Sequence, residues 1–311
     1  MSVYFGHAGL PGAARGAVAA LGNFDGVHRG HAAVIDAAKA LAAKLGAPAA
    51  AAVFTPHPRL TFQPGGDPFA LMSDAQRVRA LQAEGLTIIH HIAFDRTLAA
   101  MTPEMFVEDV LASGLGLRGV VTGGDFCFGK NRAGNAAALK EIGARFAIEA
   151  RVAEAVREPG VDHKISSSDV RRALRDGAPQ TAAALLGRPF AIEGVVAEGD
   201  KRGRTIGFPT ANIALGAYVR PAFGVYAVSN RLADGRRVAG VANLGRRPTV
   251  NGTEARLETH LFDFAEDLYG QTLEVDLLEF IRGEQKFDGL QALTAQIARD
   301  CDTARALMAQ R

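Results

Sequence analysis

A pair of histidines stands where a predicted strand turns into a predicted helix. His28 and His31 follow an apolar, strand-like run over 17–21 and open the helical pattern of 32–45. The free N–H groups and the positive dipole end of a helix start attract phosphate. Imidazoles there could hold the phosphates of a nucleotide, because each can donate a hydrogen bond or carry positive charge near neutral pH. Gly30, between them, would let a bulky ligand approach the backbone.

Simpler explanations exist for histidines at such a turn. Each could merely cap the helix or pack there, and histidine is also a common zinc ligand. The sequence offers no further well-spaced Cys or His residues that would complete a zinc site. The His-x-x-His spacing in a glycine-rich turn therefore favours a nucleotide-phosphate site.

A second candidate loop, 123–134, follows the strand-like run 119–122. In open parallel sheets, the loops beyond the carboxyl ends of strands line the ligand crevice. This loop and the histidine turn both directly follow the carboxyl end of a predicted strand. Phe126 and Phe128 could pack against a planar ring, and basic residues of the loop could meet phosphate. An ordinary loop with two buried phenylalanines would explain the pattern equally well.

Serines precede another predicted helix in the segment 165–172. Serine is a favoured N-cap, and a helix start also binds anions. Arg171 falls in the first turn, where the helix dipole disfavours a cation. A bound phosphate would remove that conflict, so the segment predicts both capping and an anion site.

The strongest feature of the second half is the basic, glycine-rich segment 199–212. Its backbone and basic side chains suit a triphosphate. Thr210 and Asn212, near its end, offer oxygen donors of the kind that Mg²⁺ prefers. By composition alone a solvated surface loop is the simpler explanation, and the later segments shift the balance toward a site.

Glu258 places a carboxylate within the β-like run 257–261. On an alternating strand it shares a face with His260, while the opposite face carries Leu257, Thr259 and Leu261. Either a solvated outer face or a polar pocket would produce this alternation. A second glycine-rich loop is expected just before it, over 240–249.

The candidate residues must be held in place by helices and strands. The pattern of the first half of the sequence predicts how these elements are arranged there. Strand-like and helix-like runs alternate there, which predicts a parallel sheet covered by helices on both faces. Strands are expected at 17–21, 49–54, 87–92, 119–122 and 145–152. Helices are expected at 32–45, at 74–84 and from Thr102 onward.

The second half predicts a different scaffold. From Phe190 onward, short β-rich segments separated by Gly, Pro and Asp-Gly signals predict a small antiparallel barrel. The expected strands are 190–196, 223–232, 237–243, 257–262 and 273–280. A closing helix over 290–308 carries an apolar stripe that begins at Leu290. We therefore expect two domains, 1–186 and 187–311.

Composition excludes several classes of protein. The 311 residues include 48% hydrophobic and 22% charged residues, as in ordinary globular proteins. The formal net charge of +2 demands neither a nucleic acid nor an anionic membrane. Two cysteines far apart in the sequence favour a reducing cytoplasm over a disulfide framework. No apolar run approaches the roughly 18 residues of a membrane helix, and no secretory signal is apparent.

Together these motifs resemble those of the bacterial bifunctional riboflavin kinase/FAD synthetase family. The first-half resemblance implies a Rossmann-like nucleotidyltransferase domain with a His-x-Gly-His signature, and it covers 22–31, 54–58, 123–134 and 165–171. The second-half resemblance implies a riboflavin kinase barrel, and it runs from 187 to 308 and includes 268–270 and 280–282. The order and spacing of the motifs together make the resemblance specific.

For the first domain, the resemblance implies transfer of AMP from ATP to FMN with release of pyrophosphate, and His28 and His31 would be catalytic. The residues implied for ATP and its phosphates are Gly22, Asn23, Phe24, Asp25, Gly30, Lys164, Ser167, Ser168 and Arg171. Those implied for the flavin are Phe62, Asp125, Phe126 and Phe128. The chain departs from the family pattern at Thr55, where members often carry an acid, and at Ser168, which replaces a threonine.

For the second domain, the resemblance implies phosphorylation of riboflavin by ATP, with Glu258 as the general base for the 5′-hydroxyl. Thr210 and Asn212 would hold Mg²⁺ with the nucleotide, and Arg282 would contribute to the flavin site. The nucleotide itself would be bound by Gly199, Lys201, Gly203, Arg204 and Gly207. The expected cofactor is Mg²⁺, with ATP as co-substrate and riboflavin, FMN and FAD as the other ligands.

Rival functions are also considered. A one-activity enzyme could use the barrel only as a flavin sensor, although the intact set of Thr210, Asn212 and Glu258 argues against a dead kinase. Small barrels also bind nucleic acids, but the near-neutral charge and the lack of a basic aromatic stripe count against that role. We expect no nucleic-acid or membrane partner, and a homo-oligomer is compatible with the sequence.

Overall fold

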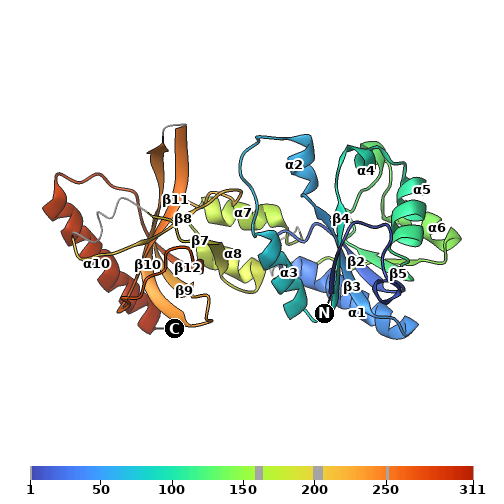
Figure 1. The fold of residues 1–311 in the computed structure, drawn as a ribbon, viewed down its shortest axis with the longest axis horizontal. Coiled ribbons are helices and arrows are strands. Elements are labelled where there is room, and N and C mark those ends of the chain that lie inside the picture. Colours follow the sequence, from blue (N-terminus) through green and yellow to red (C-terminus); the bar gives the residue numbers. More distant parts are fainter. Residues whose placement is uncertain (1, 158–163, 199–205, 250–251, 311) are drawn as a thin grey trace. The chain divides into compact units, whose positions relative to one another are not determined.

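The computed structural model describes residues 2–157, 164–198, 206–249 and 252–310. The chain forms two compact units (Figure 1). The first contains Met1–Asp67 and Asp74–Ser166, and the second contains Pro68–Ser73 and Ser167–Arg311. The short early segment groups with the second unit because Ala70 pairs with Tyr218 in an isolated bridge. The domain boundary expected between residues 186 and 187 stays a prediction.

The first unit is built on a parallel sheet of six strands, as the alternating pattern predicted. The strands are β1 (Ser2–Phe5), β2 (Val18–Gly22), β3 (Ala49–Thr55), β4 (Ile88–Ala93), β5 (Gly119–Thr122) and β6 (Glu149–Val152). Their order is β1-β4-β3-β2-β5-β6. Strand β2 thus lies between β3 and β5, where the strand order reverses, and open α/β sheets bind ligands beyond the carboxyl ends at such a switch point.

Helices and short helical turns connect these strands. They are α1 (Arg29–Leu45), α2 (Pro58–Phe62), α3 (Asp74–Ala83), α4 (Arg96–Ala100), α5 (Pro103–Met105), the π-helix η2 (Phe106–Gly114) and α6 (Ala136–Arg145), with 3₁₀ turns η1 (Gly12–Ala14) and η3 (Lys130–Arg132). The predicted start at Thr102 is confirmed, since its hydroxyl accepts the Met105 N–H at 3.2 Å. The strand expected over 145–152 begins only at Glu149, because α6 continues to Arg145.

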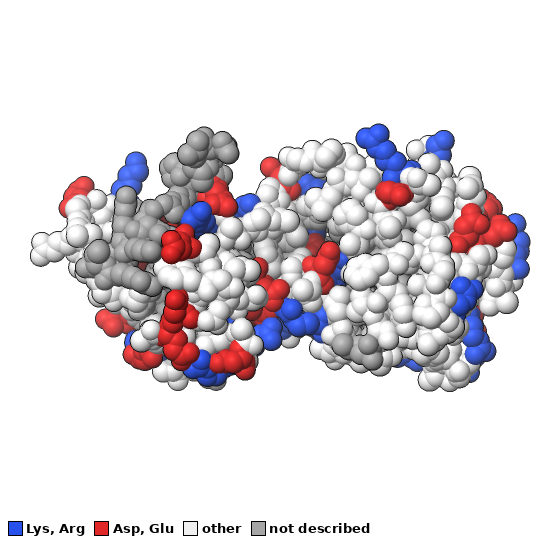
Figure 2. Space-filling view, viewed as in Figure 1, with Lys and Arg blue, Asp and Glu red and all other residues white. Residues whose placement is uncertain are grey.

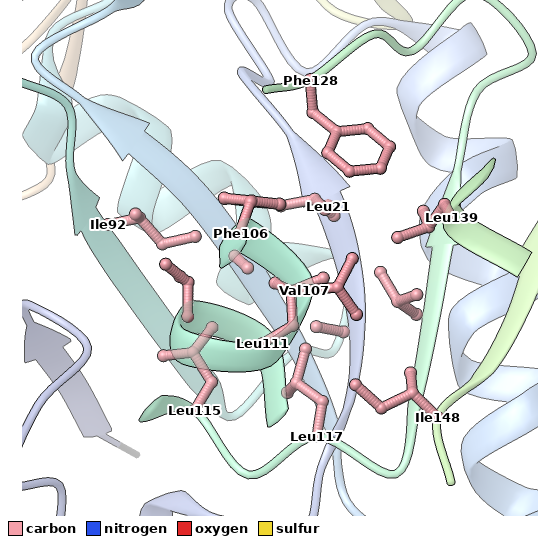
Figure 3. Close-up of a cluster of buried hydrophobic side chains, with 14 of the residues drawn as sticks. Leu21, Ile92, Phe106, Val107, Leu111, Leu115, Leu117, Phe128, Leu139 and Ile148 are labelled. Atoms are coloured by element: carbon pink, nitrogen blue, oxygen red, sulfur yellow. The ribbon is translucent and has the colours of Figure 1, made fainter. Parts of the chain in front are cut away.

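The π-helix η2 forms the centre of the core of the first unit. Its side chains Phe106, Val107 and Leu111 pack against buried residues of the sheet such as Leu21 and Ile92 (Figure 3). Each fully buried side chain of this size contributes about 1.5–3 kcal/mol. The packing holds the strand ends in fixed positions, so the loops that follow these ends also start from fixed positions.

The second unit contains a six-stranded antiparallel barrel, as predicted. Its strands are β7 (Phe190–Val195), β8 (Ala211–Ala214), β9 (Gly224–Arg231), β10 (Arg237–Thr249), β11 (Gly252–Leu261) and β12 (Thr272–Gly283). The order is β7-β12-β9-β10-β11-β8. The barrel closes where the Ala197 N–H, just after β7, donates to the Asn212 carbonyl at 2.9 Å.

The described residues of the second unit also form helices α7 (Ser167–Arg175), α8 (Pro179–Leu186) and α10 (Leu290–Ala309). Helix α10 places Cys301 and Ala304 on an apolar patch of β9 and β10 that includes Val225 and Val241. Leu290, expected in the buried stripe, is 61% exposed. Its position at the first residue of α10 puts it beyond that patch. No helix in the described residues has the length and apolarity needed to span a bilayer.

Residues 240–249, which were expected to form a loop, belong to a strand. Strand β10 runs on to Thr249 and pairs with β11 along this length. The glycines there do not break the strand. A Cβ on Gly240 would lie 2.5 Å from the His260 carbonyl oxygen, so the absent side chain permits close strand contact.

His90 is expected to make the first unit sensitive to acid. It lies in β4 with 0% of its surface exposed, and neither ring nitrogen has a hydrogen-bond partner in the described part of the chain. Burial lowers the pKa of His90 from 6.5 to about 4. The unfolded chain takes up a proton near pH 6.5 while the folded ring stays neutral. The free energy of unfolding should therefore fall from about pH 6.5 downward, by roughly 3 kcal/mol at pH 4.

Hydrogen exchange of the β4 amides, corrected for the intrinsic pH dependence, measures this fall. The variant His90→Phe keeps a ring beside Tyr4, whose own ring stacks on His90 at 5.7 Å. It should lose less protection on acidification than the wild type. An equal loss in both proteins would contradict the prediction.

Candidate functional site

The turn between β2 and α1 is buried and conformationally restrained. Asp25, Val27 and His28 are all buried. Phe24 and Val27 have positive φ angles of 51° and 39°. Bulky residues adopt this left-handed region at a cost of the order of 1–3 kcal/mol, and they remain there only where the surroundings hold them. Such restraint at a sheet switch point is typical of a functional site.

His28 and His31 cap the start of α1 reciprocally. The Nδ1 atom of His28 accepts the His31 N–H at 3.3 Å, and Nδ1 of His31 accepts the His28 N–H at 3.3 Å. The two rings stack with centroids 3.6 Å apart. Because both Nδ1 atoms accept hydrogen bonds, each neutral ring carries its proton on Nε2 and can donate from there. The two histidines thus do cap α1, and the capping hydrogen bonds also fix the orientation in which the rings could contact a phosphate.

Gly30 is needed for a reason that the sequence did not indicate. A Cβ at this position would lie 3.1 Å from the His28 ring and 3.1 Å from the Ile165 carbonyl oxygen. The glycine therefore makes room for the His28 imidazole itself. Phosphate binding by Gly30, and by Gly22 at the end of β2, stays a prediction.

The two aromatic residues of the loop after β5 differ in how deeply they are buried. Phe128 is buried in the core of the first unit beside Phe106, with ring centroids 5.4 Å apart (Figure 3). Phe126 is only partly buried and stacks on Phe128 at 5.7 Å. Phe128 is therefore a core residue, as the simpler explanation of this loop predicted. Flavin contact by either residue stays a prediction.

Asp125 and Lys164 are brought together from distant parts of the sequence. Their side chains form an ion pair. Burial alone would raise the pKa of Asp125, but the hydrogen bond and charge of Lys164, with a smaller contribution from Arg132, lower it overall. The carboxylate is thus ionised at neutral pH. A residue implied for the flavin and one implied for phosphate therefore lie side by side.

Phe62 offers an exposed aromatic ring in the same unit. It ends α2, is 66% exposed, and meets Phe94 edge-on with centroids 5.7 Å apart. Its predicted flavin contact is untested.

The serine segment enters the second unit at Ser167. Ser167 and Ser168 begin α7, as expected from the capping pattern. Arg171 donates from Nε to the Phe69 carbonyl at 2.7 Å and lies over the Phe69 ring at 5.3 Å. Because α7 begins at Ser167, Arg171 lies in its second turn and not in the first turn, where the sequence predicted it. Its predicted role in phosphate binding is untested.

Three polar side chains form one row across the barrel. Glu258 in β11 stands opposite Asn212 in β8 and opposite Asn243 in β10. Directly opposite residues of antiparallel strands project to the same face. We call Asn212, Glu258 and Asn243 the amide–carboxylate row. Asn243 was not a predicted site residue, and only the strand register brings it to Glu258.

The segment before β8 partly covers this face. Nδ1 of His260 lies 2.8 Å from the Pro209 carbonyl oxygen, and Phe208 meets the His260 ring edge-on at 5.5 Å. Asn212 is only 5% exposed, and its Nδ2 donates to the Thr210 carbonyl at 3.4 Å. The face is thus covered at one side only, since Asn212 is buried, Glu258 and His260 are half-buried, and Asn243 is exposed.

Part of the predicted nucleotide loop lies outside the described residues. Gly199, Lys201, Gly203 and Arg204 lie outside the described residues. Gly207 is exposed and has a φ of 86°, a value that favours glycine. Nucleotide contact by any of these residues stays a prediction.

Arg282 is engaged inside the second unit. Its Nε and Nη2 donate to the buried Asp300 carboxylate at 3.0 and 2.7 Å, which ties β12 to α10. Paired guanidinium and carboxylate groups of this geometry are strong. The structure therefore gives Arg282 an anchoring role, and its predicted flavin contact is untested.

The donors of the barrel suit a hard cation. Within the described residues, no group of three or more His, Cys, Asp or Glu side chains gathers to hold a metal. Asn212 offers an amide oxygen opposite Glu258, and Thr210, two residues earlier in the chain, offers a hydroxyl. Mg²⁺ needs only one or two protein ligands when phosphates and water supply the rest. The oxygen donors thus fit an ion that arrives with a nucleotide.

Two family models match the chain and define the class of protein. One, described as FAD synthetase, covers residues 10–169, and the other, described as riboflavin kinase, covers 186–308. The fold agrees with them, since a parallel α/β unit precedes an antiparallel barrel. The chain is therefore a two-part transferase.

Curated relatives match nearly the full length. A bifunctional riboflavin kinase/FMN adenylyltransferase of Escherichia coli is 42% identical over 93% of this chain and 92% of its own. Another from Haemophilus influenzae is 41% identical over 94% of both chains. The chain belongs to the bifunctional riboflavin kinase/FMN adenylyltransferase family, as the motifs indicated.

A solved structure has the same fold throughout. It is titled as a macrolide-efflux protein from Streptococcus pneumoniae, and it matches with a TM-score of 0.85 and 32% sequence identity. The match covers 97% of this chain and 98% of that one. Efflux is an activity stated in that title alone, and we do not extend it to this chain.

Proposed function

We propose that this chain makes FMN from riboflavin in its barrel and FAD from FMN in its α/β unit, using ATP for both steps. The amide–carboxylate row carries the first assignment, because it joins a carboxylate to the oxygen donors near the end of the predicted nucleotide loop. The histidine pair at the switch point of the sheet supports the second. We also propose a cytoplasmic enzyme, in keeping with its cysteine usage.

In the kinase step, Glu258 would accept the proton of the riboflavin 5′-hydroxyl. The oxygen then attacks the γ-phosphorus of ATP, and the bond to the bridging oxygen breaks to release ADP. Thr210 and Asn212 would hold Mg²⁺, which neutralises charge on the phosphates when bound. A half-buried carboxylate suits this task because it can accept a proton in a place that is partly shielded from water.

In the adenylyl step, a phosphate oxygen of FMN would attack the α-phosphorus of ATP and pyrophosphate would leave. His28 and His31 would donate from Nε2 to phosphate oxygens whose charge rises in the transition state. Positioning and charge stabilisation are then the main sources of rate, and no covalent enzyme intermediate is required. Asp125 and Lys164, which form an ion pair in the same unit, would support the bound substrates.

A product assay tests this proposal. The full chain is incubated with riboflavin, ATP and Mg²⁺, and riboflavin, FMN and FAD are separated by chromatography over time. FMN should appear first and FAD after it, each only when ATP is present. FAD from supplied FMN without any FMN from riboflavin would favour the one-activity enzyme with a sensor barrel.

The nucleic-acid rival is tested by retention on single-stranded DNA. On the face shown in Figure 2, Lys and Arg are interspersed with Asp and Glu over the described surface. Mixed charge of this kind gives weak attraction to a phosphate backbone. Salt-dependent retention at physiological ionic strength would revive that rival.

A further inference from the structure

An arginine is buried beneath the histidine turn. Arg77, in α3, is 5% exposed. Its Nη1 donates to the Asn23 carbonyl at 3.3 Å, and its Nη2 donates to Thr55 Oγ1 at 2.8 Å and to Asp74 at 2.7 Å. One guanidinium therefore joins the residue after β2, the last residue of β3 and the start of α3.

The contacts extend further into the first unit. Thr55 Oγ1 is also 2.8 Å from Nδ1 of His91, on β4. The charge of Asp25, within the turn, acts on Arg77 and partly offsets the lowering of the Arg77 pKa that burial causes. Arg77 thus links the carboxyl ends of β2 and β3, and Thr55 extends the link to a residue within β4.

Stability alone does not account for this arrangement. Among the described residues, Arg77 Nε, Asn23 Oδ1 and His91 Nε2 are buried without hydrogen-bond partners. Apolar replacement of a partly satisfied buried charged network is often neutral or stabilising. Folding stability alone is therefore a weak reason for a guanidinium at this position.

The backbone next to its contact needs external support. Phe24 follows Asn23 directly and has a φ of 51°, and Val27 has a φ of 39°. Residues in this region persist when their surroundings over-determine them. The hydrogen bond from Arg77 to the Asn23 carbonyl acts at the first residue of this strained turn, ahead of both histidines.

We infer that Arg77 is a positioning residue for adenylyl transfer, which braces Asn23 against the end of β3 and so fixes the turn that carries His28 and His31. This inference rests on the proposed function of the histidine pair. It predicts a loss in the chemical step rather than in ATP binding. A shift of about 1 Å at such a pair can lower the rate by the order of 100-fold.

The test compares Arg77→Met and Arg77→Lys with the control Arg79→Met. Arg79 lies on the same helix and is exposed. For FAD synthesis from supplied FMN, Arg77→Met should lower kcat by about 10–100-fold with KM for ATP changed less than threefold. Lysine keeps the charge but lacks the planar guanidinium that donates to both strand ends at once. Arg77→Lys should therefore recover only part of kcat. Arg79→Met should match the wild type.

Two further variants separate positioning from loss of folding. Leu81→Ala removes a fully buried side chain of α3 and destabilises the unit without touching the turn. Thr55→Val removes the β3 end of the brace, together with the contact to His91, and should lower kcat by about 2–10-fold. An unchanged kcat in the folded Arg77→Met or Arg77→Lys variant, or in Thr55→Val, would overturn the inference. So would an equal kcat loss in Leu81→Ala at a temperature where it is folded. Absence of FAD formation by the wild type would instead refute the proposed function.

Discussion

Replacing Glu258 with glutamine is expected to stop FMN formation while leaving the conversion of supplied FMN to FAD intact. Glutamine keeps the size of the side chain but cannot accept the proton of the riboflavin 5′-hydroxyl. Loss of a general base lowers kcat by about 10²–10⁴-fold. Because the two reactions are proposed for different units, one sample reports both when riboflavin, FMN and FAD are separated by chromatography.

A matched control for this variant lies on the same strand. Glu254→Gln removes a carboxylate that pairs with Arg256 at 2.9 Å and lies outside the amide–carboxylate row. It should retain FMN formation. Unchanged FMN formation in Glu258→Gln would remove the carboxylate from the mechanism. Loss of both activities would indicate a folding defect, which thermal unfolding of the variant would reveal.

A His28→Asn variant is expected to lose FAD synthesis although α1 keeps an N-cap. Asparagine is among the best N-cap residues, and its side-chain oxygen can accept the His31 N–H as Nδ1 of His28 does. It lacks the Nε2 donor that the proposed mechanism aims at phosphate. Removing one such donor typically costs 10²–10³-fold in kcat. Steady-state kinetics with supplied FMN measure the loss, and FMN formation from riboflavin should be unaffected.

This substitution distinguishes capping from catalysis. If the histidine only caps the helix, His28→Asn keeps its activity and its unfolding temperature. A useful control is Thr102→Ala, which removes the cap of another helix in the same unit. It should lower stability by about 1 kcal/mol and preserve FAD synthesis. Equal losses of FAD synthesis in His28→Asn and Thr102→Ala would assign the effect to folding.

Much of the fold was accessible from the sequence because periodicity reports which faces are buried. The alternation of apolar strands and amphipathic helices predicted the parallel sheet, and the short β-runs predicted the barrel. Strand β1 was missed because Ser2–Phe5 is short and lies at the edge of the sheet. The extension of β10 to Thr249 was missed because its glycines are typical of loops, and only pairing with β11 makes them part of a strand.

Some residues of the candidate sites could be recognised from the sequence, and others could not. His28 and His31 were recognisable because their chemistry and spacing are local to one turn. Asn243 and Arg77 were not, since an asparagine in a glycine-rich stretch and an arginine in a polar helix look solvated in the sequence. Their importance arises from register and burial, which depend on contacts between distant segments.

By itself the sequence determined the chemistry available to this protein: a histidine pair at a helix start, oxygen donors beside a basic loop, and a carboxylate within a β-run. These features are local, because a few neighbouring residues set the conformation of a turn or a strand. Only the tertiary structure decided which side chains meet. It paired Asp125 with Lys164, set Glu258 between two asparagines, gave Arg282 to Asp300, and placed Arg77 under the histidine turn. The physical reason is that these contacts follow from strand order and core packing, which the whole chain determines together.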